Sequence, residues 1–515
     1  MKVQPSIAEG SADSPESAES VPSTAPGVST PARRSPLAWV VGLVLALTAL
    51  AIYAACNPEH WNVYNHFVWQ ADAYLHGRVS FPYPIGPDQG TSWQPVNDYL
   101  QDVYPLTDAG GSPTGQVLLP FPPLPALVLL PFVALWGFAT DQEAIALCLG
   151  GLGVGLMFWM LGGLRLQLRV RAMVTVLFAT GTVWWWASVV GSTWYLAHLV
   201  AVNVALLAVG VTLRHDDLAA DQDPWSEDEE AEADAEARAG GPLGRARRLW
   251  ATTWPPDRSQ ILAGFLLGVA ATARLPLVFA APWFIMVGGG GSWRRRLVSA
   301  AIGGFLPMAA LLGYTYATTG ELLHPGYDYQ YRLEAYGYPT LGYNPAWSVE
   351  DPRYVPQNLK ILFGALPAIA PDVAPDTLGF SAPHLLCTEP GATRSLFNTE
   401  CPLAIPLDIG TSILVSAPGL LLALFAFRQR LSSRVALGTF AAVGIVGLFN
   451  LMHFSQGWVQ WGYRFSLDFL PFLLPMVALG AAGAGGRPRL TAWALVVAGA
   501  LVNLWGVIWG GLLAW

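Results

Sequence analysis

The chain has 515 residues, of which 53% are hydrophobic and only 12% are charged, with a formal net charge of −8 and a mean hydropathy of +0.42. So few charges cannot cover the surface of a soluble protein of this size. The apolar residues gather in runs long enough to cross about 30 Å of hydrocarbon, which takes about 20 helical residues each. Composition therefore predicts an all-α, polytopic membrane protein. It gives no indication of nucleic-acid binding, because much of the acid sits in one segment, 227–236.

Residues 1–36 are rich in Ser, Pro, Ala and Glu and are expected to form a disordered cytoplasmic N-terminus. Arg33 and Arg34 precede the apolar run 37–55, which we interpret as an uncleaved signal anchor. A cleaved signal peptide is the alternative interpretation. The charged region before the run is too long for that, and no clean small-x-small cleavage site follows.

The second apolar run, Pro120–Gly137, is short and contains five prolines. If it crossed the membrane, Arg165, Arg169 and Arg171 would lie outside. If it is an interfacial or re-entrant helix, these arginines lie inside, as the positive-inside rule favours. We therefore predict an interfacial or re-entrant helix.

The remaining apolar runs predict spans of alternating direction, which puts every basic cluster on the cytoplasmic side of an inner (cytoplasmic) membrane. With the first run they give about 11 spans. The segments 57–142 and 318–409 then lie outside, and 214–258 forms a disordered cytoplasmic loop. The predicted domains are a transmembrane module over 37–317, the outer loop 318–409 and the C-terminal helices 410–515. The spans after the first are expected at 143–164, 172–190, 194–213, 260–274, 277–288, 297–317, 410–427, 433–452, 464–484 and 490–512.

The two runs 260–274 and 277–288 are too short to cross alone. They predict a helical hairpin that is broken at Arg274-Leu275-Pro276, since Pro removes a backbone donor and ends a helix. An Arg at this depth is costly without a partner. Arg274 could bind the phosphate of a lipid carrier, because guanidinium matches phosphate oxygens. A salt bridge or snorkelling to headgroups is the equal alternative.

Residues 62–78 predict an amphipathic helix in the outer interface, with its apolar face towards lipid. Its apolar arc holds Val63, Phe67, Val68, Ala71, Tyr74 and Leu75. Its polar arc is expected to face the outer loops; for Gln70 and His76, plain exposure to water explains the pattern. That arc holds Asn62, Asn65, His66, Gln70, Asp72 and His76, with Trp69.

A second polar group lies at the outer end of a later span, where Tyr463, Arg464 and Asp468 follow Gly462. The i, i+4 spacing of Arg464 and Asp468 allows an ion pair on one helix face. A helix-entry pair within an aromatic belt explains most of this pattern. A contact to phosphate or sugar is the functional alternative. His198, also at an outer helix end, is interpreted as a satisfied interfacial histidine.

Cys387 and Cys401 share one loop that is predicted to face an oxidising compartment, so a disulfide between them is expected. The alternative is two free thiols. For metals, the sequence contains no HExxH, Cys/His cluster or DxD pattern, and no cofactor is expected.

The layout from about residue 37 to 317 resembles the GT-C superfamily of polytopic glycosyltransferases, which take sugar from polyprenyl-phosphate carriers. The resemblance rests on the first span, the interfacial helix that ends at His76-Gly77-Arg78, the Pro-rich half-helix at Pro122–Pro125 and the hairpin with a basic tip. The later Gly462-Tyr463-Arg464 followed by Leu470-Pro471 is similar to a stretch of bacterial members.

This resemblance implies an inverting transfer of sugar from a polyprenyl-phosphate donor to an extracytoplasmic acceptor, with a carboxylate as general base. Arg274 and Arg464 would stabilise charge on the departing phosphate. The family's catalytic acid usually opens the interfacial helix, where this chain has Asn62. We therefore assign the base to Asp72, with Asp98, Asp102, Asp108 or a loss of activity as alternatives. Asn62, Asn65, His66 and Tyr463 complete the expected substrate-binding set.

The rival class is a non-catalytic membrane protein, either a transporter or a scaffold for envelope assembly. Transporters usually bury polar groups at mid-membrane and show two-fold repeats. In this sequence no repeat is visible, and the polar groups gather at predicted outer helix ends. The pattern favours the enzyme.

Overall fold

The computed structural model is mostly helical. It describes residues 36–57, 59–60, 64–82, 102–216, 241–329, 344, 346–375, 385–431, 433–457, 459–483, 486–513 and 515.

Six helices in these ranges are long and apolar enough to cross a membrane, which supports a membrane protein. A bent pair of helices, with an angle of 50° between them, makes a seventh span if it is counted as one. The full count of about 11 stays a prediction. The six are α1 (Pro36–Cys56), α4 (Gln142–Leu161, continued by η3, Gly162–Leu164), α7 (Thr193–His215), α12 (Trp293–Thr319), α17 (Arg434–Met452) and α19 (Leu490–Leu512); the bent pair is α5 (Leu168–Thr180) and α6 (Trp184–Val190).

Shorter helices make up the other predicted spans and the predicted interfacial segment, and proline lies inside two of them, α3 and α18. The predicted hairpin is present: α10 ends at Ala271, and the chain resumes as η5 at Leu275, with Pro276 in its first turn. These helices are α3 (Leu124–Trp136), η2 (Gly137–Ala139), α10 (Arg258–Ala271), η5 (Leu275–Ala280), α11 (Ala281–Met286), α15 (Ile413–Ser416), η8 (Pro418–Leu421), α16 (Leu422–Arg430), η9 (Arg464–Asp468) and α18 (Leu470–Ala481).

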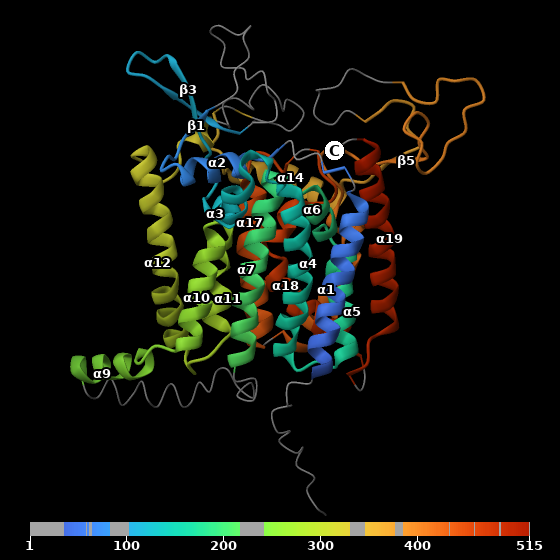
Figure 1. Cartoon of the computed structure of the whole chain (residues 1–515). Helices are drawn as coiled ribbons and strands as arrows, with labels where there is room; N and C mark the ends of the chain where they lie inside the picture. The colour runs from blue at the N-terminus through green and yellow to red at the C-terminus, as the bar shows by residue number, and fades with distance from the viewer. Residues whose placement is uncertain are drawn as a thin grey trace, which may run out of the picture.

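The long helices run side by side and define two ends of the bundle (Figure 1). We call the end that carries α2 (His66–Leu75), α3 and α14 (Val355–Gly364, preceded by η7, Pro352–Tyr354) the loop end. The opposite end carries α9 (Gly241–Thr253) and is called the α9 end. There the buried carboxylate of Asp216 accepts a hydrogen bond from the Gly288 amide at 3.2 Å and pairs with Arg434 at 3.5 Å.

Helices α10 and α12 pack at backbone contact. A Cβ atom on Gly303 would collide with the Ile261 carbonyl oxygen, and one on Gly264 would collide with the Ala300 backbone. Small residues allow this close approach. In a membrane, where the hydrophobic effect does not drive helices together, such close packing stabilises their association. The contact fixes the hairpin, and therefore its tip, against α12.

The all-α expectation needs a correction at the loop end, which contains two small sheets. In the first, β3 (Pro113–Leu118) pairs antiparallel with both β1 (Phe81–Pro82) and β2 (Tyr104–Thr107). In the second, β4 (Ala368–Ile369) pairs with β5 (Ala404–Ile405). The strands are only two to six residues long, so they carry no long alternating pattern that would have predicted them.

Part of the loop 214–258 that was predicted to be disordered is helical: α7 continues to His215, and α9 covers Gly241–Thr253. The acidic block 227–236 lies outside the described residues.

The predicted helix over 62–78 is shorter than expected, and its apolar face is not turned to lipid. Phe67, Val68 and Ala71 of α2 are fully buried and belong to the main core. Phe67 contacts Phe121 near the start of α3, with 6.4 Å between ring centroids. The expectation was wrong because α3 folds back beneath α2 and covers it. Sequence periodicity reveals an apolar face but not what covers it.

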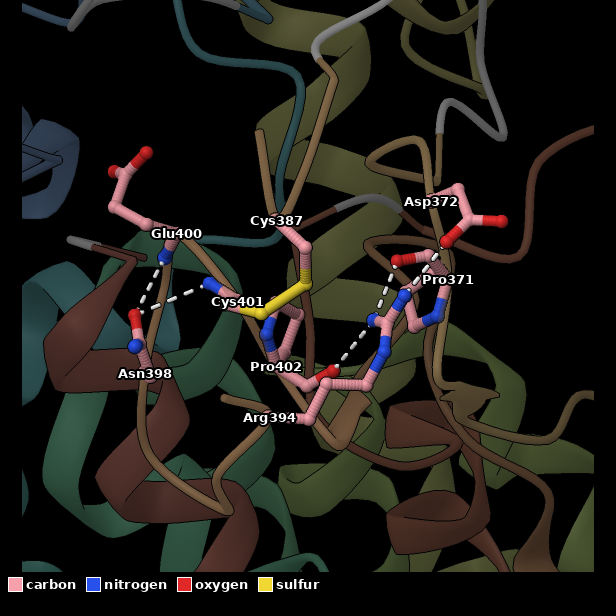
Figure 2. The surroundings of a disulfide bond; sticks show 8 residues. All are labelled: Pro371, Asp372, Cys387, Arg394, Asn398, Glu400, Cys401 and Pro402. Carbon is pink, nitrogen blue, oxygen red and sulfur yellow. Dashed lines mark hydrogen bonds and ion pairs between the residues drawn. A yellow bond between two sulfur atoms is a disulfide. The ribbon is translucent and has the colours of Figure 1, made fainter. Parts of the chain in front are cut away.

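The predicted disulfide joins Cys387 and Cys401, whose Cα atoms lie 4.4 Å apart (Figure 2). Next to it, Arg394 donates hydrogen bonds to the carbonyls of Pro371 and Pro402 and pairs with Asp372 at 2.6 Å. The segment is also bound to the last helix, since Trp509 Nε1 donates to the Leu396 carbonyl at 3.0 Å.

Candidate functional site

The hairpin tip holds Arg274 against a buried carboxylate. Arg274 Nε donates to Asp468 Oδ1 at 3.2 Å, and its Nη2 donates to Oδ2 at 2.9 Å. The Asp468 side chain is fully buried, whereas that of Arg274 is 22% exposed. A two-point guanidinium–carboxylate contact fixes the orientation of both groups. Arg274 is therefore ion-paired, and one part of its side chain remains accessible.

Two further groups surround Asp468. His198 Nδ1, from the second turn of α7, lies 3.0 Å from Oδ1, and the ring is almost fully buried. Asn450, near the end of α17, donates to Oδ2 at 3.2 Å. The carboxylate thus joins α7, α17, the hairpin tip and η9. His198 Nε2 is buried and has no hydrogen-bond partner among the described residues.

The expected ion pair between Arg464 and Asp468 is not formed: among the described residues, this carboxylate pairs with Arg274 and also contacts the His198 ring. Residues 464–468 form the 3₁₀-helix η9. With three residues per turn, positions i and i+4 do not share a face. The i, i+4 rule assumed an α-helix that the chain does not form here.

Arg464 nevertheless lies near the same cluster. Its guanidinium carbon is 5.3 Å from the centre of the Phe465 ring, and that of Arg274 is also 5.3 Å away. The guanidinium carbon of Arg464 also lies 5.8 Å from the centre of the Tyr195 ring, while its buried Nε has no hydrogen-bond partner within the described part of the chain. We call Arg274, Arg464, His198, Asn450 and Asp468 the Asp468 cluster; both guanidinium groups lie near Phe465, and that of Arg274 pairs with the carboxylate.

A turn that is rich in glutamine supports Arg464. Gly457 has a φ of +93°, and a Cβ atom there would lie 2.8 Å from the Arg464 guanidinium carbon. Glycine is therefore needed both for the backbone conformation and for the close approach. The Tyr463 hydroxyl donates to Gln456 Oε1, and Gln456 Nε2 donates to the Asn450 carbonyl at 3.0 Å. Tyr463 is thus a buried structural neighbour of the cluster.

A small apolar hollow, with a cavity volume of about 40 Å³, lies at the loop end, beside the hairpin tip. Burial lowers the pKa of His324 to about 4 and raises the pKa of Tyr327 to about 12, so both wall residues are neutral at pH 7. Leu312 lines the hollow and is also exposed on α12. The hollow therefore adjoins the lipid-facing side of α12. Its wall includes Pro120, Pro123, Leu275, Leu311, Tyr314 and Leu322.

Asp72 lies on α2, with a side chain that is 16% exposed. Its Oδ2 is 3.5 Å from His76 Nδ1 and 4.0 Å from Arg78 Nη2. The hollow is lined by neither Asp72 nor Arg274, so the shared cavity predicted for these two residues stays a prediction. One link does join α2 to the wall of the hollow: the hydroxyls of Tyr74 and Tyr314 are 2.7 Å apart.

The other residues expected on the polar arc of α2 behave differently. His66 is fully buried, and its Nδ1 lies 2.9 Å from Thr193 Oγ1 at the start of α7. Gln70 is also fully buried, which contradicts the expectation of plain exposure. Asn65 is the N-cap of α2 without a side-chain capping bond. Asn62 lies outside the described residues.

Among the alternative acids, Asp102 is the one that contacts the end of α7. Its Oδ2 accepts a hydrogen bond from Trp194 Nε1 at 2.7 Å, and its φ is +61°, which is unusual for a residue other than glycine. Trp194 is one helical turn before His198. Asp108 instead caps its own turn by accepting from the amides of Gly110 and Ser112, both at 2.8 Å. Asp98 lies outside the described residues.

No family model, curated protein or solved structure matches the chain. Within the described ranges, no group of three or more His, Cys, Asp or Glu side chains could hold a metal ion.

Arg274 and Arg464 were predicted from the sequence, whereas Asn450 and the contact of His198 with Asp468 were not. A signal for both was present: each is a strongly polar residue within a mostly apolar helix, and in a membrane such a residue marks a site of specific contact.

The buried ion pair allows a stability prediction. Arg274→Gln leaves the Asp468 carboxylate without its main cation, and breaking a buried pair from one side costs about 3–5 kcal/mol. The matched control is Arg353→Gln, which breaks the Arg353–Asp351 pair, where the arginine is 56% exposed; exposed pairs contribute about 0–1 kcal/mol. Thermal unfolding of the detergent-solubilised chain should show a large loss of stability for Arg274→Gln only. Equal melting of both variants would contradict the structural role of the pair.

Proposed function

We propose that this chain is a membrane glycosyltransferase that transfers a sugar from a polyprenyl-phosphate carrier to an acceptor on the non-cytoplasmic side. The observation that carries the proposal is the position of the Arg274 and Arg464 guanidinium groups, each 5.3 Å from the Phe465 ring, together with an apolar hollow beside the hairpin tip that holds Arg274. A carrier of this class is an anionic phosphate joined to a long apolar chain. The site offers a partner for each part.

The charge balance of the Asp468 cluster supports phosphate binding. The cluster contains two guanidinium groups and one buried carboxylate, and the Arg274 side chain is partly exposed. The ion pair with Asp468 holds Arg274 in one orientation, which lowers the entropy lost when an anion binds. Guanidinium groups would also stabilise the charge that develops on a departing phosphate.

The hollow supports binding of the apolar chain. Its wall is lined by proline, leucine and neutral aromatic side chains, and it reaches the exposed side of α12. Leu275 lines the hollow and follows Arg274 directly in the chain. A lipid that enters from the bilayer could therefore place its headgroup near the arginines while its chain stays in an apolar environment.

For the general base, Asp72 stays our prediction from the sequence, and Asp102 is the alternative that the geometry favours. Asp102 hydrogen-bonds Trp194, one helical turn from His198, so it is connected to the Asp468 cluster through α7. The contacts of Asp72 are to the basic residues His76 and Arg78 on its own segment.

The rival proposal, a transporter or a scaffold, has a specific observation in its favour. Asp468 and His198 are both almost fully buried among helices, and buried ionisable groups in membrane proteins also serve ion pathways. We favour the transferase because these groups lie at the loop end rather than along the bundle.

We further propose that α2 lies in the membrane interface, that the chain has about 11 spans, and that the loop end faces away from the cytoplasm of an inner membrane. The arginine-rich helix starts at Trp293 and Arg434 support this orientation, since basic residues favour the cytoplasmic side.

Orientation can be tested by labelling intact cells with a membrane-impermeant maleimide, in a background that lacks Cys56 and Cys148. We expect Lys360→Cys, exposed on α14, to react from outside. Gly244→Cys, on α9, should react only after permeabilisation. The reverse pattern would overturn the orientation and with it the assignment of the site.

Donor binding can be tested by native mass spectrometry of the purified chain with a polyprenyl phosphate. We expect Arg464→Gln to weaken binding about 10- to 100-fold, because a hydrogen bond to a charged group contributes about 1.5–3 kcal/mol. Arg353→Gln is the control and should bind normally. Equal affinity of the wild-type chain for the neutral polyprenol would contradict a phosphate site.

The base can be identified by comparing Asp72→Asn, Asp102→Asn and the control Asp108→Asn for release of polyprenyl phosphate from a polyprenyl-phosphate sugar that is first shown by native mass spectrometry to bind the wild-type chain. Loss of a general base should lower the rate about 10²- to 10⁴-fold without loss of the fold. Full activity in Asp72→Asn would remove Asp72 from the mechanism. Wild-type rates in both Asp72→Asn and Asp102→Asn would argue against either acid as the base.

A further inference from the structure

Helix α9 exposes an apolar face that the bundle does not cover. The side chains of Leu243 and Trp250 are 77% and 63% exposed, although both are large and apolar. Their spacing, seven residues apart with Ala246 between them, puts the three residues on one face of the helix. Trp254, just beyond the helix end, continues this face, and its ring stacks on that of Trp250 with 5.3 Å between centroids.

The position of α9 explains how such a face can be stable. Its axis runs across those of α10 and α12, beside their ends (Figure 1). The turn after α9 is attached to the bundle, since Arg295 donates to the Trp254 carbonyl at 3.3 Å. The start of α12 exposes Trp293 and Leu297 as well. The apolar face of α9 is thus continuous with the lipid-facing side of α12.

The composition of α9 is also typical of a helix at a membrane surface. Arg245, Arg247 and Arg248 lie within four residues of one another in the helix, and the helix contains no acidic residue. A short helix with exposed tryptophan and leucine and several arginines fits the boundary between headgroups and acyl chains. The arginines also add attraction for anionic lipids.

From these observations we infer that α9 is a membrane-surface helix that binds the anionic lipid leaflet at the α9 end, with Leu243, Trp250 and Trp254 inserted below the headgroups. This surface is separate from the Asp468 cluster, which lies at the other end of the bundle, and it does not depend on the proposed transfer reaction.

The test uses the full chain in nanodiscs of phosphatidylcholine with a quarter phosphatidylglycerol, in the background without Cys56 and Cys148. Nitroxide labels are placed at Trp250→Cys and, as the control one-third of a turn away, at Gly244→Cys. We expect the ratio of oxygen to nickel-chelate accessibility to be about fivefold or more higher at position 250, because that label is immersed and the control is in water. Equal ratios would overturn the proposal. Protection of position 250 from both reagents would also overturn it, since that result indicates a protein partner.

The contribution of the α9 arginines can be tested separately. Replacing Arg245, Arg247 and Arg248 together by Gln should lower the ratio at position 250 in these nanodiscs to the value found in pure phosphatidylcholine. An unchanged ratio would overturn the role of anionic lipid.

Discussion

A carboxylate that is fully removed from water must be compensated inside the protein, and in this chain that requirement organises the loop end. Asp468 is buried, and its partners come from α7, the hairpin tip and α17. An uncompensated charge at such a site would cost several kcal/mol. The helices that supply these partners are therefore held in one arrangement by electrostatics as well as by packing.

The pairing with Asp468 leaves part of the Arg274 side chain accessible to an anion. The carboxylate fixes Arg274 but does not enclose it, and Arg464 adds a second guanidinium that lies beside Gly457 and Tyr195. An arrangement that served stability alone would need one cation for one carboxylate. The two guanidinium groups near Phe465 and the apolar hollow beside the hairpin tip are the features on which the proposed binding of a lipid phosphate rests.

Much of the architecture could be predicted from the sequence because it depends on local patterns. Hydropathy located the long helices, the Pro276 break located the hairpin, and two cysteines in one loop predicted the disulfide. The errors have a common cause. Whether α2 faces lipid or protein depends on α3, and whether Arg464 reaches Asp468 depends on a 3₁₀ geometry and on a competing arginine distant in the chain. Periodicity describes one element at a time and cannot supply the neighbour.

The distance along the chain between the partners of Asp468 has a consequence for biosynthesis. Arg274 and Asp468 are separated by 194 residues, and the arginine is made first. When the hairpin enters the bilayer, its tip must therefore keep its charge in contact with water or headgroups until the later helices have been synthesised. Because α10 has only 14 residues, which rise about 21 Å, it is too short to cross about 30 Å of hydrocarbon. The long Arg274 side chain must therefore reach towards the headgroups or water in the meantime. The charge at the tip of the broken hairpin is thus compensated inside the protein only after Asp468 has been synthesised and inserted.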